Sequence, residues 1–274
     1  MKTMFSALLL MIPFLSGVLA DTPPPGSEPE YYYTRVMYTG SGTPERGGPI
    51  PVRYPALRGF KCSDLERGEG GLGGGWRTDY PASDCKFMWG VERLTTINAY
   101  REAPHPMALM DPKIFEFPYL YIVEPGQMLL SSEEAAQLRE FLSRGGFLHV
   151  DDFWGLYQLQ NFTEQMAKVF PNRRLEPVPL TDEIFHTFFD IDKVMQIPNV
   201  SNGCYGRQYW ESATDKEPRI LGIRDDVGRL MVIVTYNSDL GDAWEHMDNG
   251  CYPETLSGQA YRMGINFIIY SMSH

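Results

Sequence analysis

The sequence lacks the short motifs that mark the common hydrolases and phosphate-binding proteins. No Gly-x-Ser-x-Gly or His-Glu-x-x-His pattern occurs, so nothing indicates a serine-nucleophile turn or a zinc-protease helix. The glycine-rich run from Arg67 to Gly75 follows no predicted strand and ends without Gly-Lys-Ser/Thr. We interpret this run as a surface loop, with a backbone cradle for phosphate as the alternative.

Basic residues are few. The chain has 24 Lys and Arg against 35 Asp and Glu, which gives a net charge of −11. A surface this acidic argues against nucleic acid and anionic membranes as partners, because both carry the same sign of charge. It favours an exported, well-solvated protein or one that gathers cations.

Long apolar segments are confined to the N-terminus. Lys2 precedes an apolar run from Ala7 to Leu15, and Val18-Leu19-Ala20 offers small or aliphatic residues for cleavage. This pattern predicts a signal peptide over residues 1–20. A membrane-spanning helix is the weaker alternative, because the run is shorter than the roughly 20 residues a span needs and Pro13 interrupts it. We therefore expect a secreted or periplasmic protein without a transmembrane segment after cleavage.

The segment after the signal peptide is rich in proline. Residues 21–30 contain Pro23-Pro24-Pro25 and predict a stiff, extended leader. The remaining chain is long enough for one large core and shows no internal repeat. We predict that residues 31–274 form a single domain.

Cysteine is scarce, and its spacing is informative. The four cysteines are Cys62, Cys85, Cys204 and Cys251. No Cys-x-x-Cys pair occurs, which argues against a thiolate metal site. In an oxidising compartment an even count predicts disulfides. Three pairings are possible, and we favour Cys62–Cys85 with Cys204–Cys251 because each keeps its loop local.

Strands and helices are predicted to alternate along most of the chain. Strands are expected near residues 31–38, 119–123, 146–150, 220–223 and 230–236, and helices near 84–94, 131–142, 162–170 and 253–271. The segment 119–150 contains a capping box, Ser131 to Glu134, and predicts a βαβ unit. The alternation predicts an α/β fold, with a mostly parallel sheet and helices on both faces.

Acidic side chains follow two of these strands. Asp151 and Asp152 follow the strand near 146–150. The loop after residues 230–236 carries Asn237, Asp239, Asp242, Trp244, Glu245 and His246. In an open parallel sheet, ligands lie beyond the carboxyl ends of the strands. We therefore expect these acids to line one crevice.

An oxygen-rich crevice of this kind suits a hard divalent cation such as calcium. The predicted ligands are Asp151, Asp152, Asp239 and Asp242, with His149 as a further candidate. The alternative is local: Asp242 would cap a helix, Glu245 would complete a capping box, and His149 would pack under a helix and bond a backbone carbonyl. His149 and Asp151 could also act as a base and the group that orients it.

Aromatic residues accompany a further acid near the glycine run. Asp79 lies between Trp76 and Tyr80, and Asp84 is expected to cap the helix that follows. Aromatic rings beside a carboxylate can hold a sugar or another polar ring. The same arrangement is equally common as packing that pins a loop.

As a set, these residues resemble the DUF4159 family, a bacterial domain of unknown function. The resemblance rests on Thr78-Asp79-Tyr80-Pro81, Gly145-Gly146-Phe147-Leu148 with Asp151-Asp152, Asn237-x-Asp239-x-Gly241-Asp242-x-Trp244-Glu245, and Gly264-x-Asn266. It implies a flavodoxin-like sheet similar to that of class I glutamine amidotransferases. It does not imply their activity, because those enzymes carry a Cys in the turn after a central strand, where this sequence has Asp151-Asp152. Family members are often exported or membrane-tethered.

The leading functional hypothesis is an exported, non-catalytic binding or accessory protein with an acidic and aromatic crevice. The crevice would hold a small polar ligand such as a saccharide, or an envelope partner protein. The predicted ligand-binding residues are Trp76, Asp79, Tyr80, Asp151, Asp152, Trp154, Asn237, Asp239, Asp242, Trp244 and Glu245. The rival is a metal-dependent hydrolase in which Glu245 acts as base on a metal-bound water. A third hypothesis is a purely structural envelope component.

Overall fold

The computed structural model describes residues 28–40, 60–65 and 73–274. The predicted signal peptide, most of the predicted leader and most of the glycine run lie outside the described residues. Within them, five parallel strands lie side by side in one sheet: β1 (Thr34–Met37), β3 (His105–Ala108), β4 (Tyr119–Val123), β6 (Phe147–Asp151) and β9 (Leu230–Tyr236). β8 (Arg219–Arg224) pairs antiparallel with β9, and β7 (Glu176–Pro177) pairs antiparallel with β8.

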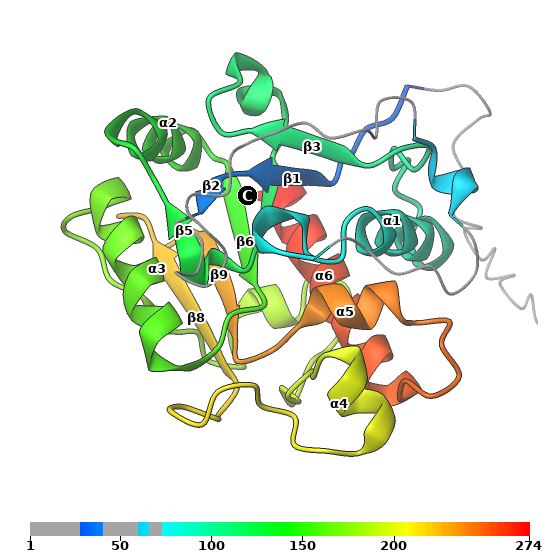
Figure 1. Ribbon diagram of the computed structural model, residues 1–274. Helices are drawn as coiled ribbons and strands as arrows, with labels where there is room; N and C mark the ends of the chain where they lie inside the picture. The colour runs from blue at the N-terminus through cyan, green and yellow to red at the C-terminus, as the bar shows by residue number, and fades with distance from the viewer. Residues whose placement is uncertain (1–27, 41–59, 66–72) are drawn as a thin grey trace, which may run out of the picture.

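The strand order of this seven-stranded sheet is β3-β1-β4-β6-β9-β8-β7 (Figure 1). The chain adds β3 on one side of β1 and then returns to place β4 on the other side. The carboxyl ends of β1, β4, β6 and β9 therefore lie along one edge. A short antiparallel pair, β2 (Thr39–Gly40) and β5 (Met128–Leu129), lies apart from the main sheet.

Helices cover both faces of the sheet (Figure 1). α1 (Ala82–Leu94), α5 (Leu240–Glu245) and α6 (Glu254–Ser273) pack on one face, in a core that contains Phe87, Trp244 and Phe267. α2 (Ser132–Ser143) and α3 (Gly155–Val169) pack on the other face. A short helix, α4 (Val200–Tyr205), follows the irregular segment after β7. This mostly parallel sheet with helices on both faces confirms the predicted α/β, flavodoxin-like fold.

Short 3₁₀ helices complete the described structure. They are η2 (Cys62–Asp64), η3 (Gly75–Arg77), η4 (Pro112–Glu116), η5 (Pro125–Gln127) and η6 (Glu183–Phe185). The most important for the site is η3, because it leads directly into the loop that precedes α1.

The predicted βαβ unit is present as β4, α2 and β6. Ser131 caps α2 by accepting a hydrogen bond from the backbone N–H of Glu134, and the Glu134 carboxylate accepts one from the Ser131 N–H, which is the predicted capping box. Gly145 ends the turn after α2 with a φ of 108°, a conformation that favours glycine.

Two predicted caps are wrong. Asp84 lies inside the first turn of α1, whose N-cap is Pro81, and its carboxylate accepts hydrogen bonds from the buried Arg35 instead. Asp239, not Asp242, caps α5, because its side chain accepts from the Asp242 N–H. Asp84 is drawn to a partner from a distant strand, whereas the α5 cap is local and lies three residues before the predicted one.

α3 begins earlier than predicted, at Gly155. Its first amide groups are satisfied by side chains from distant segments: Gly155 N donates to Asn237 Oδ1 at 3.0 Å, and Leu156 N donates to Thr214 Oγ1 at 3.1 Å. The local sequence could not predict these hydrogen bonds, because Asn237 and Thr214 are far from α3 along the chain.

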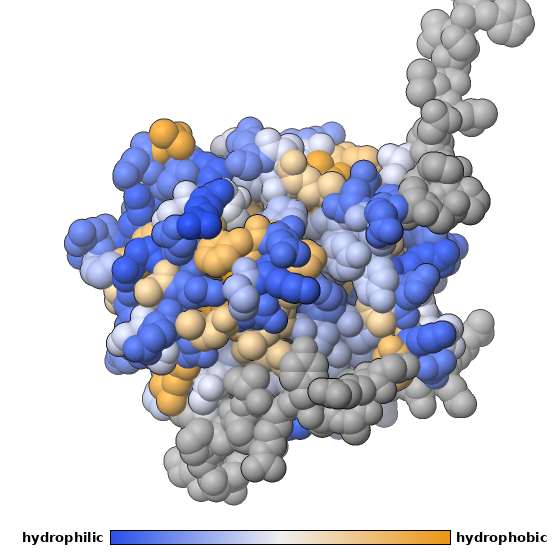
Figure 2. All heavy atoms as spheres, turned by 90° about the horizontal axis from the view of Figure 1, so that it is seen from above, coloured by the Kyte–Doolittle hydropathy of each residue, from blue (hydrophilic) through white to orange (hydrophobic). Residues whose placement is uncertain are grey.

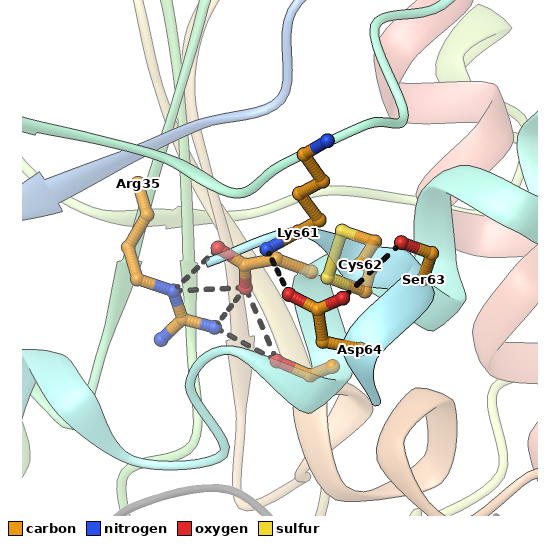
Figure 3. Close-up of a disulfide and its surroundings, with 8 residues drawn as sticks. Arg35, Lys61, Cys62, Ser63 and Asp64 are labelled. Atoms are coloured by element: carbon orange, nitrogen blue, oxygen red, sulfur yellow. Dashed lines mark hydrogen bonds and ion pairs between the residues drawn. A yellow bond between two sulfur atoms is a disulfide. The ribbon is translucent and has the colours of Figure 1, made fainter. Parts of the chain in front are cut away.

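Disulfides join Cys62 to Cys85 and Cys204 to Cys251, and no described cysteine is free. The first ties η2 to α1, beside the Arg35 guanidinium (Figure 3). No helix within the described residues is long and apolar enough to cross a membrane. On the face shown in Figure 2, hydrophilic residues surround separate hydrophobic patches.

Candidate functional site

Left-handed backbone marks the edge where the parallel strands end. The described non-glycine residues with positive φ are Asp79 (62°), Glu124 (48°), Asp152 (54°) and Asn237 (55°). Three of them directly follow β4, β6 and β9, and Asp79 lies in the loop between η3 and α1. Such conformations are uncommon and concentrate at functional sites. The strand-end edge is therefore the candidate site.

Three acids converge at this edge, and we name them the acid cluster: Asp79, Asp239 and Asp242. Each offers one carboxylate oxygen, and these oxygens all lie within 4.8 Å of one another. Their residues are buried, with 8%, 3% and 7% of their surface exposed. Carboxylates this buried normally have a cationic or hydrogen-bonding partner.

Two further groups adjoin the acid cluster. Asp152, Glu211 and Asp239 also place one oxygen each within 4.8 Å, and the Glu211 side chain is exposed. Asp242 forms a third group with Glu245 and His246, whose Nε2 lies 3.3 Å from Asp242 Oδ1 and 3.2 Å from Glu245 Oε1. Asp239 and Asp242 thus link three acidic groups into one continuous set.

Burial and repulsion together disfavour the charged forms of Asp79 and Asp239. Burial raises the pKa of Asp79 well above its ordinary value, and the neighbouring charges of Asp242 and Glu245 raise it further. Burial likewise raises the pKa of Asp239, with Asp152 and Asp242 as the next contributors. A bound cation would reverse this effect, because its positive charge favours the ionised carboxylates.

Asp79 carries the clearest sign of a missing partner. Its Oδ2 is buried and has no hydrogen-bond partner among the described residues. A Cβ added at Gly241 would lie 2.5 Å from this oxygen, so only glycine allows the α5 turn to approach it. Buried carboxylate oxygens without a donor are rare, because the lost hydration is not replaced.

Asp151, predicted as a cation ligand, belongs to none of these groups. Its Oδ2 accepts hydrogen bonds from the Leu240 N–H at 2.8 Å, the Gly241 N–H at 3.0 Å and the Tyr121 hydroxyl at 3.0 Å. Its Oδ1 accepts one from Thr235. Asp151 is therefore outside the acid cluster, and both of its oxygens already accept hydrogen bonds.

His149 is also separated from the cluster. Its ring nitrogens contact the hydroxyls of Tyr119 at 2.7 Å and Thr235 at 3.3 Å, not the backbone carbonyl that the packing interpretation expected. Burial lowers the pKa of His149 to about 3, so the ring is neutral. This environment fits a packed core histidine and leaves no hydrogen bond with Asp151 for a base-and-orienter pair.

The predicted aromatic rim is buried. Trp76, Tyr80, Trp154 and Trp244 are 2%, 4%, 5% and 0% exposed. Trp244 stacks on Phe87 with ring centroids 4.0 Å apart, and Trp154 Nε1 donates to Asp152 Oδ1. These rings are therefore packed within the protein and offer no open face for a sugar. Asn237 is likewise structural, because its side chain joins Gly155 to the Glu217 carbonyl.

Two acids at this edge were missed by the sequence analysis. Glu124 directly follows β4, and its Oε2 accepts a hydrogen bond from the Gly75 N–H at 2.9 Å. The strand-end rule that selected Asp152 would have found it. Glu211 lies in an irregular segment after α4, so no periodic pattern could have placed it at the edge.

Comparison with known proteins identifies the family but no activity. A family profile described as "Domain of unknown function (DUF4159)" matches residues 63–272, which is most of the chain. No curated protein matches the sequence. The function must therefore be argued from the acid cluster itself.

Proposed function

Because this chain belongs to the DUF4159 family, a family of unknown function, we propose its function from the geometry of the site. The protein is an exported, non-catalytic binding protein that holds a divalent cation at the acid cluster. Two observations on Asp79 carry this proposal: its Oδ2 is buried without a hydrogen-bond partner among the described residues, and its carboxylate places one oxygen within 4.8 Å of oxygens of Asp239 and Asp242.

The spacing of the acid cluster matches one cation. Two oxygens that bind the same Ca²⁺ at about 2.4 Å can be at most about 4.8 Å apart. The cluster oxygens meet this limit, since all three lie within 4.8 Å of one another. The cation would draw together carboxylates that otherwise repel, which offsets the cost of burying them.

The donor set favours calcium. Asp79, Asp239 and Asp242 offer only oxygen, the ligand type that hard cations prefer. Ca²⁺ accepts six to eight oxygen ligands in flexible geometry, so backbone carbonyls and water can complete the shell around the three carboxylates. Asp152 and Glu211 group with Asp239 but not with Asp79 or Asp242, so we do not count them among the ligands. Zinc is a poorer fit, because it selects nitrogen and sulfur and the nearest imidazole, that of His246, is already held by Asp242 and Glu245.

The acid cluster lies between two segments of the chain, so a cation bound there would connect them. Asp79 belongs to the loop before α1, whereas Asp239 and Asp242 belong to the turn that opens α5. A cation shared by the two segments would cross-link them. The two disulfides support the exported setting, because such bonds persist in oxidising compartments, where calcium is also plentiful.

The test is a thermal melt with Ca²⁺ and with chelator, together with elemental analysis of the purified protein. We expect Ca²⁺ to raise the melting temperature of the parent and to have little effect on Asp79→Asn or Asp239→Asn. Asp226→Asn is the matched control, because its side chain is 93% exposed. Equal melts with and without Ca²⁺ in the parent would overturn the proposal.

A metal-dependent hydrolase is the second candidate, and one observation favours it. Glu245 is 4% exposed and lies beside Asp242 and His246, where it could act as base on a metal-bound water. The assay is hydrolysis of nitrophenyl phosphate and acetate esters with Ca²⁺, Mn²⁺ or Zn²⁺. Turnover that Glu245→Gln abolishes without loss of metal binding would favour the enzyme over the binding protein.

A further inference from the structure

The proposed cation site is assembled from two segments, which we name by the acids they carry. The Asp79 loop covers residues 76–84, and the Asp239 turn covers residues 237–242. One buried set of side chains contacts both segments. This set contains Arg35, Tyr121 and Asp151, which are all 0% exposed.

Arg35 holds the Asp79 loop on both sides of Asp79. From β1, its guanidinium donates to the carbonyls of Trp76 at 3.2 Å and Thr78 at 3.0 Å, which precede Asp79. It also donates from Nε to both oxygens of Asp84, at 2.9 and 3.1 Å, after Asp79 (Figure 3 shows these contacts from Arg35). A planar group with five donors is suited to this task, because it reaches several acceptors in one rigid geometry.

Asp151 holds the second segment, the Asp239 turn. Its Oδ2 accepts from the N–H groups of Leu240 at 2.8 Å and Gly241 at 3.0 Å. These two residues separate Asp239 from Asp242. The carboxylate therefore sets the conformation of the segment that carries two of the three cluster acids.

Tyr121 connects the two anchors. Its hydroxyl donates to Asp151 Oδ2 at 3.0 Å, and its ring lies under the Arg35 guanidinium, with 4.9 Å from Cζ to the ring centroid. The ring interaction is a cation–π contact between two fully buried side chains, and such contacts are strongest when desolvated. A continuous chain of contacts thus runs from the Asp79 loop through Arg35, Tyr121 and Asp151 to the Asp239 turn.

We infer that Arg35, Tyr121 and Asp151 are positioning residues for the cation site: they bind no cation and set the separation of Asp79 from Asp239 and Asp242. The inference rests on the proposed function for its cation. The structural part of the inference, that one network of contacts holds both segments, does not depend on cation binding. Asp151 is assigned to positioning because both of its oxygens already accept hydrogen bonds.

The first test compares Asp151→Ala with Asp151→Asn by calorimetric titration with Ca²⁺. The asparagine oxygen can accept from Leu240 and Gly241, while its NH₂ donates to Thr235 Oγ1, which keeps its bond to the Val150 carbonyl at 3.1 Å. We expect Asp151→Ala to weaken Ca²⁺ binding at least about tenfold and Asp151→Asn to stay within about fivefold of the parent. Equal losses in both variants would show that the charge of Asp151, not its hydrogen bonding, matters, and would overturn the inference.

The second test needs no cation. Hydrogen exchange in chelator reports directly on the Leu240 and Gly241 amides and on the Ser83 amide, which donates to the Asp79 carbonyl at 2.9 Å. Tyr121→Phe removes one hydroxyl and leaves the ring under Arg35. We expect exchange to rise at least about tenfold in both segments. Tyr270→Phe is the matched control, because its hydroxyl accepts from Leu230 at the opposite end of β9.

The two tests separate the possible failures. If the parent binds no Ca²⁺ but Tyr121→Phe loosens both segments, the cation proposal fails and the network is upheld. If exchange at Leu240, Gly241 and Ser83 is unchanged in Tyr121→Phe, the network does not couple the segments and the inference is wrong. Tyr121→Phe also decides the question should Asp151→Ala fail to fold.

Discussion

Asp151 and Asp79 are both buried at the same edge of the sheet, yet their surroundings are opposite. Asp151 has four hydrogen-bond donors around its two oxygens. Asp79 has a buried oxygen with none, and its acidic neighbours repel it. The difference shows that burial alone does not identify a binding site. The hydrogen-bond partners distinguish the two acids, because a buried carboxylate oxygen without donors requires a ligand or a proton.

The Arg35–Asp84 pair resembles Asp151, because its polar groups have hydrogen-bond partners. Both side chains are almost fully buried, and every group on the guanidinium finds an acceptor. We call Arg35, Asp84, Tyr121 and Asp151 the base, because their hydrogen bonds hold the two segments that carry the acid cluster. The comparison predicts that substitutions in the base cost stability and that substitutions in the acid cluster cost cation binding.

The largest effect is expected for Arg35→Met. This change removes the cation from a buried pair and leaves Asp84 unpaired, which costs about 3–5 kcal/mol in the free energy of unfolding. Urea denaturation measures it. Arg144→Met is the control, because the Arg144–Glu140 pair is 62% and 54% exposed and should contribute less than about 1 kcal/mol. Similar losses in the two variants would contradict the distinction between buried and surface pairs.

The second prediction compares the loss of stability when the Asp151 or the Asp79 carboxylate is removed. In chelator, Asp151→Ala leaves the Leu240 and Gly241 N–H groups unpaired and should cost about 1–3 kcal/mol. Asp79→Asn in chelator should cost less than about 1 kcal/mol, since it removes a carboxylate that has no donor on Oδ2 and whose charged form burial disfavours. Urea midpoints at one pH give both numbers. A larger loss in Asp79→Asn than in Asp151→Ala would reverse the roles assigned here.

A smaller effect concerns the buried His149. Because burial lowers its folded pKa to about 3, only the unfolded state binds its proton as pH falls below about 6.5. Stability should therefore decline by about 1 kcal/mol from pH 6.5 to pH 5.5 on account of this residue. His149→Gln should show a decline smaller by this amount in urea titrations at the two values. The acids with raised pKa act in the opposite direction in both proteins and cancel in the difference. Identical pH profiles would rule out the buried, neutral histidine.

Much of the fold could be predicted because its signals are local. The capping box at Ser131, the apolar strands near 119–123 and 146–150, and the hairpin of β8 and β9 depend on neighbouring residues. The partners of Asp84 and of the α3 N-terminus could not be predicted, since they come from Arg35, Asn237 and Thr214, far away in sequence.

The sequence predicted the location of the candidate site more accurately than it predicted which residues form it. The strand-end rule brought Asp152, Asp239 and Asp242 to one edge, where the structure has them. It also selected Asp151, because alternation along a strand does not reveal which carboxylate meets backbone donors. Sequence alone gave no sign of Glu211, and it could not show that the four aromatic rings are buried.

The most direct test of the account is a terbium titration of the metal-free protein, read through emission excited by the tryptophans beside the site. Tb³⁺ replaces Ca²⁺ in oxygen sites, and Trp154 donates a hydrogen bond to Asp152 at 2.8 Å, close to the cluster. Our prediction is sensitised emission that saturates, that Ca²⁺ displaces, and that Asp79→Asn abolishes. Emission that is absent in the parent, or equally strong in Asp79→Asn, would contradict it.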